Sequence, residues 1–128
     1  MDKKRQPVIV DCDPGIDDAV ALLLAARAPE LELAAVTAVA GNVGLDKTSL
    51  NARRVLTLAG MEVPVYAGAA GPMFGDQVTA DEVHGADGLL GIPAPEPAFS
   101  LGEEAAWDVI WQKALSYGGE LEIVATGP

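Results

Sequence analysis

Short apolar runs alternate with longer helical segments along this chain. The runs are rich in β-branched residues, and the segments between them carry apolar residues at helical spacing. A chain that alternates strand and helix in this order predicts an α/β fold, with a mostly parallel sheet and helices on both faces in a Rossmann-like arrangement. The predicted strands are 7–11, 31–40, 63–67 and 121–125, and the predicted helices are 17–28, 46–59 and 100–117.

The ends of the predicted helices carry local signals. Pro29 follows the first helix and Gly60 follows the second, and proline and glycine commonly occupy these positions. Ser100-Leu-Gly-Glu103 matches a capping box, which predicts that the third helix begins there and runs to Tyr117. The first helix is apolar nearly all round, which predicts burial between other layers.

The charge of the chain argues against two classes of partner. Its 128 residues include 8 basic and 19 acidic side chains, a formal net charge of −11 at pH 7. Nucleic acids and anionic membrane surfaces attract clustered Lys and Arg, so we expect neither as a partner. Half of the residues are hydrophobic, which is unlike a disordered acidic tail and is sufficient for a real core.

Redox and targeting signals are few. Cys12 is the single cysteine, which excludes an internal disulfide and any zinc site built from several cysteines. The first residues do not match a signal peptide, and the longest apolar run, 19–26, is far shorter than the ~20 residues that span a bilayer. We therefore expect a cytoplasmic protein.

One long loop and the last strand suggest an incomplete domain. Residues 68–99 are rich in glycine and proline, and a loop of that length in a compact domain is usually functional or mobile. The chain stops directly after the fourth predicted strand, whose far edge then has no neighbour. We expect residues 1–128 to be the N-terminal part of a single α/β domain, truncated at its C-terminus.

Polar clusters follow three of the predicted strands. They are the segment 11–18, the pair Gly41-Asn42 and the pair Thr126-Gly127. Parallel sheets bind ligands beyond the carboxyl ends of their strands. These clusters are far apart in the sequence, but the fold should bring them together into one binding site.

The first cluster, DCDPGIDD, is a strongly acidic turn. It places Asp11, Asp13, Asp17 and Asp18 within a few residues, and their negative charges repel one another. The N-terminus of the following helix can stabilise some of these carboxylates, and a hard divalent cation can bind others through oxygen. The simplest alternative is that Asp17 and Asp18 only decorate the start of the helix. Asp13 on the preceding turn favours metal binding.

Two other known types of acidic site match this turn less well. An EF-hand counted from Asp11 would need glycine and glutamate where Ile16 and Leu22 stand. An aspartate-based phosphotransferase could use Asp11 and Asp13 after a first strand, and it stays open as a weak alternative. Asp11 itself is interpreted as support for the loop through backbone hydrogen bonds rather than as a direct ligand.

The segment VDCDPGIDDAVALLLA resembles the N-terminal signature of the inosine-uridine nucleoside hydrolase family. The similarity continues, in family order and spacing, through VTAVAGNV, NARRVL, VPVYAG and VHGADGLLG, and it ends in IVATGP. It covers essentially the whole chain. Family members are considerably longer, so the resemblance also implies a nucleoside-hydrolase type of domain that is incomplete here.

The resemblance implies an activity and a set of residues. Family members use one calcium ion to hydrolyse the N-glycosidic bond of a ribonucleoside, in nucleoside salvage, giving ribose and a free base. Asp13, Asp18 and the carbonyl of Thr126 would bind calcium, and Asp13 would also activate the attacking water. Asp17 would bind the ribose hydroxyls, and Asn42 would line the pocket. The alternative for Asn42 is a loop residue in the left-handed conformation.

The remaining expectations concern residues near the base and beyond the chain. His84, the only histidine, would contact the base, unless it is a loop residue with local hydrogen bonds. Further calcium and ribose ligands belong to the family's C-terminal half, so this segment alone should be inactive. The full-length protein should form dimers or tetramers. A function of a different class stays open, namely a non-catalytic ligand-binding or interaction fragment with an incomplete site.

Overall fold

The computed structural model describes residues 3–128. Its four strands form one parallel sheet in the order β3-β2-β1-β4. The elements in chain order are β1 (Gln6–Cys12), α1 (Ile16–Arg27), β2 (Leu31–Ala38), α2 (Leu45–Leu58), β3 (Val65–Ala67), the short α3 (Asp81–His84), α4 (Ala106–Tyr117), a 3-10 turn (Gly118–Glu120) and β4 (Glu122–Ala125). The parallel α/β architecture predicted from the alternation of strand and helix is confirmed.

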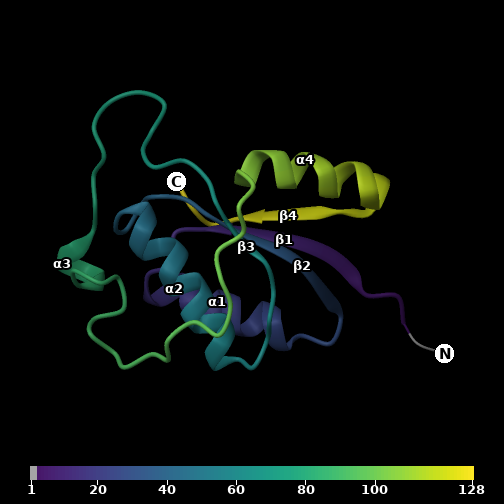
Figure 1. The fold of residues 1–128 in the computed structure, drawn as a ribbon, viewed down its shortest axis with the longest axis horizontal. Coiled ribbons are helices and arrows are strands. Elements are labelled where there is room, and N and C mark those ends of the chain that lie inside the picture. Colours follow the sequence, from purple (N-terminus) through teal and green to yellow (C-terminus); the bar gives the residue numbers. More distant parts are fainter. Residues whose placement is uncertain (1–2) are drawn as a thin grey trace.

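Helices cover both faces of the sheet. Figure 1 shows α1 and α2 on one side and α4 on the other. Successive side chains of a strand point to opposite faces, so neighbouring residues of β1 enter different parts of the core. Val10 belongs to a cluster with Leu22 and Leu56 from α1 and α2, whereas Ile9 packs with Val109 from α4. β1 is therefore buried on both faces, and the loop that follows it begins from a rigid element.

The predicted start of the third helix is wrong. The other predicted boundaries agree within two residues, but α4 begins at Ala106 rather than at Ser100, and no side chain caps it. The reason is a competing contact of the backbone. The N–H of Gly102 donates to the carbonyl of Val65 at 2.8 Å, and Leu101 packs against the core. These residues therefore extend along β3 instead of opening a helix.

The outer side of the sheet next to β4 is open. β4 is an edge strand, as the sequence predicts, and all four of its residues are exposed. The prediction that α1 is buried all round is wrong, because Val20 and Leu24 are 62% and 72% exposed. Within residues 3–128, no helix has the length and apolar character needed to cross a membrane.

Candidate functional site

The carboxyl ends of three strands are joined at Asp11. Its carbonyl accepts the N–H groups of Thr126 at 2.8 Å and Gly127 at 3.2 Å, which ties the end of β4 to β1. Its carboxylate accepts the hydroxyl of Thr37 in β2 at 2.5 Å. The predicted support role of Asp11 thus has a different form, because its carboxylate accepts a hydroxyl while its carbonyl accepts the backbone N–H groups.

The turn after β1 is locked to the loop after β2 through Asp13. The carboxylate of Asp13 accepts the backbone N–H of Asn42 at 2.9 Å, and the side-chain amide of Asn42 donates to the carbonyl of Asp13 at 3.0 Å. The N–H of Asp13 donates to the carboxylate of Asp18 at 2.9 Å. Both carboxylates are therefore held in fixed positions before any ligand binds.

Gly41 leaves the space that the Asp13 carboxylate occupies. A Cβ atom added at Gly41 would lie 2.1 Å from Oδ2 of Asp13 and 2.7 Å from its Cγ, which is closer than real Cβ atoms approach other atoms. The small residue at this position is thus required by the carboxylate next to it.

Two carboxylates are buried here with no cationic side chain against them. Asp13 and Asp18 are 7% and 4% exposed, and neither salt bridge within residues 3–128 involves them. Two effects raise the pKa of Asp13 to about 6: burial, which is the larger, and the contact with the Asp18 carboxyl. The N–H of Asn42 lowers this pKa in part. An uncompensated pair of buried carboxylates suits a hard divalent cation, which binds through oxygen.

Four of the predicted site residues line one cavity of about 410 Å³. Asp13 lies on its wall after β1, Asp17 reaches it from the first turn of α1, Asn42 from the loop after β2, and Thr126 from the end of β4. Asp18 is not in the wall, but its carboxylate contacts Asp13. The predicted convergence of the polar clusters is therefore observed.

The side chains present meet only part of what a metal needs. Within the described residues 3–128, no three side chains of His, Cys, Asp or Glu lie close enough together to hold a metal ion. A calcium ion bound between Asp13 and Asp18 would also need oxygen ligands from the backbone and from elsewhere, since calcium takes six to eight oxygens. The oxygen-only chemistry and the excess negative charge fit such an ion.

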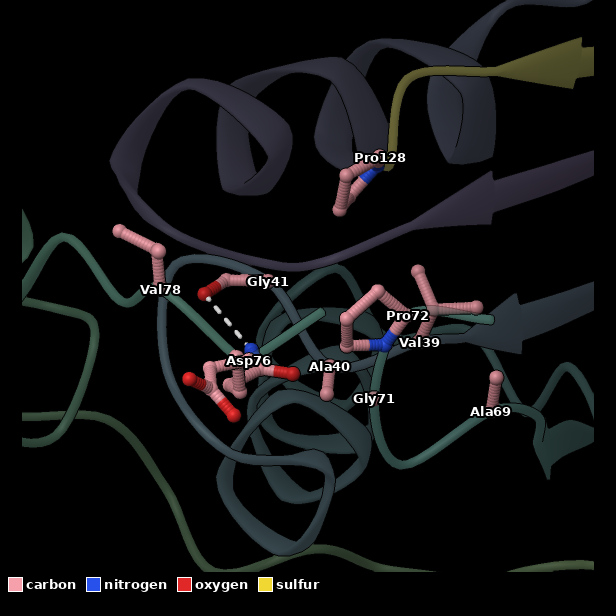
Figure 2. A pocket seen from close by; sticks show the side chains of 10 residues that line it. Val39, Ala40, Gly41, Ala69, Gly71, Pro72, Asp76, Val78 and Pro128 are labelled. Atoms are coloured by element: carbon pink, nitrogen blue, oxygen red, sulfur yellow. Dashed lines mark hydrogen bonds between the residues drawn. The ribbon is translucent and has the colours of Figure 1, made fainter. Parts of the chain in front are cut away.

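A second cavity of about 270 Å³ adjoins the first and shares Gly41, Val78 and Pro128 with it. Figure 2 shows Val39 and Pro72 on one side of this cavity and Gly41 and Val78 on the other. The side chain of Gln77 donates to the carbonyl of Gly41 at 3.3 Å. The long segment 68–99 therefore forms a wall beside the carboxylates, in the position expected of a functional loop.

His84 lies against the acidic turn but outside the walls of these cavities. Its Nδ1 accepts the N–H of Ile16, the first residue of α1, at 3.1 Å. A Cβ atom at Gly15 would lie 2.4 Å from that nitrogen, so the ring packs directly on Gly15. The partner is distant in sequence, and the alternative of a loop histidine with only local hydrogen bonds is wrong.

Asn51 belongs to the site region but was not identified from the sequence. It lies in α2, is 1% exposed, and its side-chain amide donates to the carbonyls of Pro14 at 3.2 Å and Asp87 at 2.7 Å. One sequence feature could have identified Asn51: it is a polar residue one helical turn before Val55, on the apolar face of the helix.

The raised pKa of Asp13 predicts how the stability of the metal-free chain depends on pH. Between the ordinary value of 3.8 and about 6, the folded chain binds more protons at Asp13 than the unfolded chain. The free energy of unfolding contributed by this group therefore falls as the pH rises through that window. Urea unfolding with calcium removed, at about pH 4.5 and about pH 6.5, should show a larger loss for the wild type than for Asp13→Asn. Equal losses would contradict the prediction.

Comparisons with known proteins agree with this geometry. The family model described as inosine-uridine preferring nucleoside hydrolase matches residues 8–128. The pyrimidine-specific ribonucleoside hydrolase RihA of Klebsiella pneumoniae is 46% identical over 123 residues, which are 95% of this chain and 40% of that protein. Its counterpart in Photobacterium profundum is 44% identical over 96% of this chain and 40% of that protein. The chain thus spans about 40% of the length of these relatives.

Two solved structures are similar over nearly the whole chain. A plant nucleoside hydrolase superposes with a TM-score of 0.90 at 38% identity, covering 98% of this chain and 40% of the other. A purine-preferring ribonucleoside hydrolase from Gardnerella vaginalis also gives a TM-score of 0.90, at 32% identity over 95% of this chain and 40% of the other. The fold is shared with both.

Proposed function

This chain belongs to the inosine-uridine preferring nucleoside hydrolase family, and from that premise we propose that it supplies the metal- and ribose-binding part of a calcium-dependent ribonucleoside hydrolase. The observation that carries the proposal is the buried pair of carboxylates, Asp13 and Asp18, beside the cavity that Asp17, Asn42 and Thr126 line. The reaction would cleave the N-glycosidic bond with water and release ribose and a free base.

The proposed calcium ligands are the carboxylates of Asp13 and Asp18 and the carbonyl of Thr126. Support comes from their oxygen chemistry, from the uncompensated charge, and from the way Asp11 holds the end of β4 next to the acidic turn. A bound calcium ion would lower the pKa of a water molecule and orient the ribose diol. Its remaining ligands would come from outside the residues described here.

Four residues of this chain would have separate roles in the reaction. Asp13 would accept the proton of the attacking water, a role that suits a carboxyl whose pKa is raised to about 6. Asp17 projects into the cavity from the first turn of α1, where it can accept hydrogen bonds from the ribose hydroxyls. The negative charges would also favour the oxocarbenium-like transition state of glycosidic cleavage. Asn42 would complete the wall, and His84 would lie on the side of the base.

The substrate class is the ribonucleosides. RihA of Klebsiella pneumoniae is named pyrimidine-specific, and the less similar Gardnerella vaginalis enzyme is named purine-preferring. We propose that uridine is the better substrate, because the pyrimidine-specific relatives share more of the sequence. The protein would act in nucleoside salvage in the cytoplasm, as a dimer or tetramer.

A chimera tests the proposed function. It consists of residues 1–128 followed by the portion of Klebsiella pneumoniae RihA that this chain does not cover. We expect the chimera to release ribose from uridine faster than from inosine in a reducing-sugar assay, and to lose activity when calcium is chelated. We expect the 128-residue chain alone to show no appreciable turnover, because it lacks some of the residues needed to hold ribose in reactive geometry.

The outcomes separate the alternatives. A chimera that binds calcium and folds like RihA but does not turn over either nucleoside would favour a non-catalytic binding fragment. A covalent aspartyl phosphate would favour a phosphotransferase, although Asp11 bonds Thr37 and lies outside the cavity wall. Robust turnover by the 128-residue chain would contradict the expected inactivity of this segment.

A further inference from the structure

One buried amide joins two segments that are distant in sequence. The side-chain nitrogen of Asn51 donates to the carbonyl of Pro14, within the acidic turn, and to the carbonyl of Asp87, within the segment that follows α3. Asn51 is almost fully buried in α2. Among residues 3–128, no other side chain donates to either carbonyl, so this amide satisfies both. Its bond to Pro14 is buried and its bond to Asp87 is partly buried.

The segment that carries His84 is organised by its own contacts. The carboxylate of Asp87 accepts the N–H groups of Leu89 at 2.9 Å and Gly91 at 3.2 Å, and the N–H of Leu90 donates to the carbonyl of His84 at 2.8 Å. These bonds make 84–91 a small folded unit. Its position relative to the acidic turn must therefore be fixed by contacts outside the unit.

Gly88 allows the unit to approach α2 closely. Its φ of 86° lies in the region that favours glycine. A Cβ atom there would lie 2.8 Å from the amide nitrogen of Asn51 and 3.2 Å from the carbonyl of Pro14. The backbone of the unit, the amide and the acidic turn thus meet at one point without space between them.

Few other contacts could hold the unit in place. Lys47 donates to the carbonyl of Ala86 at 2.7 Å, but this bond is exposed to solvent and is correspondingly weak. Within residues 3–128, the N–H of Ala80 at the start of α3 also donates to the carbonyl of Asn42 at 2.8 Å, which anchors the far end of α3 but not the segment after it. The bond that reaches the acidic turn from the unit itself runs from the N–H of Ile16 to Nδ1 of His84. That bond forms only if the unit already lies at the correct distance from the start of α1.

We infer that Asn51 is a positioning residue that sets the spacing between the acidic turn and His84. It touches neither the cavity that the carboxylates line nor the proposed metal ligands, and it acts through the Pro14 and Asp87 carbonyls. The purpose of this spacing rests on the proposed function: it would hold His84 and the carboxylates around one ribonucleoside. The spacing itself can be measured without substrate.

Amide hydrogen exchange in the metal-free chain tests the inference. The Ile16 amide reports the contact with His84, and the Leu22 amide, in the buried middle of α1, reports the stability of the helix. In Asn51→Ala the ratio of the Ile16 rate to the Leu22 rate should rise about tenfold, the effect of losing one hydrogen bond. Asn51→Asp keeps the size of the side chain but removes the donor, and it should behave in the same way.

Thr48→Val is the matched control. Thr48 is fully buried in the same helix, and its hydroxyl donates only to the carbonyl of Leu45 within that helix. This variant should leave the exchange ratio unchanged even if it lowers stability. In the chimera, Asn51→Ala should raise KM for uridine several-fold more than it lowers kcat.

Three results can be told apart. If both amides exchange faster together in the Asn51 variants, the residue only stabilises the fold and the inference fails. If Asn51→Asp keeps the wild-type ratio, the donor is not the important feature and the inference also fails. A changed exchange ratio in the metal-free chain, together with a chimera that has no nucleosidase activity, would retain the positioning role and contradict the proposed function instead.

Discussion

Asp13→Asn in the chimera is expected to lower kcat about 10²–10⁴-fold at saturating calcium, the usual effect of losing a general base. Asparagine keeps the size and one oxygen of the side chain, but it removes the negative charge and the ability to take a proton. Because the loss acts in the transition state, kcat should fall rather than KM simply rise. Steady-state kinetics with uridine across a calcium titration, with calcium binding measured separately, would check this.

The controls for Asp13 separate its two proposed roles. Asp108→Asn changes an exposed carboxylate on α4 that does not line the cavity, and it should leave kcat and calcium affinity unchanged. Asp17→Asn should chiefly raise KM, because Asp17 is proposed to hold ribose. If excess calcium restored near-normal kcat to Asp13→Asn, Asp13 would remain a calcium ligand and the base would be another group.

Gly41→Ala is expected to weaken calcium binding about 10–100-fold, the range for changes that move a ligand without replacing it. The added methyl group would lie 2.1 Å from Oδ2 of Asp13, so the carboxylate must turn away and lose the N–H of Asn42. Isothermal titration of the chimera with calcium would measure the effect. Activity should recover partly at high calcium, because the carboxylate itself is still present.

Gly119→Ala provides the matched control for Gly41. An added methyl group at Gly119 meets nothing within 4 Å, and the residue does not have a positive φ. Calcium affinity should therefore equal that of the wild type. Equal affinities in both alanine variants would show that the site tolerates movement of Asp13, and its rigid placement would not be needed for calcium binding.

Local patterns predicted the parts of the fold that local forces decide. Gly60 ends α2 with a positive φ of 72° and donates its N–H to the carbonyl of Thr57, as its place after the apolar pattern indicates. The acidic turn and Asn42 could be placed together because parallel strands bring their carboxyl ends to one edge. These predictions needed only the period of the pattern and the strand order.

The errors came from contacts between distant segments. Ser100 begins no helix, because the backbone at Gly102 pairs with Val65, and no local signal reports a partner so far away. The alternative for His84 was a loop residue with local hydrogen bonds, whereas its ring accepts the N–H of Ile16 in α1; contact with the base stays a prediction. The role of Asn51 was missed for the same reason, since its acceptors lie in two other segments.

The bonds made by Asp11 suggest how enzymes of this architecture could change their preferences. The carboxylates stand on loops fastened to strand ends, whereas the adjoining wall is built by a separate segment, 69–80. This segment contacts the loop after β2 through the side chain of Gln77, which donates to the carbonyl of Gly41, and through the N–H of Ala80, which donates to the carbonyl of Asn42. Because the bond from Ala80 uses only backbone groups, side chains of the wall such as Val78 and Thr79 can be replaced while this attachment to the loop after β2 is kept. In the proposed hydrolase, selectivity for a base and cleavage of its bond would then be separable traits, open to independent selection or engineering.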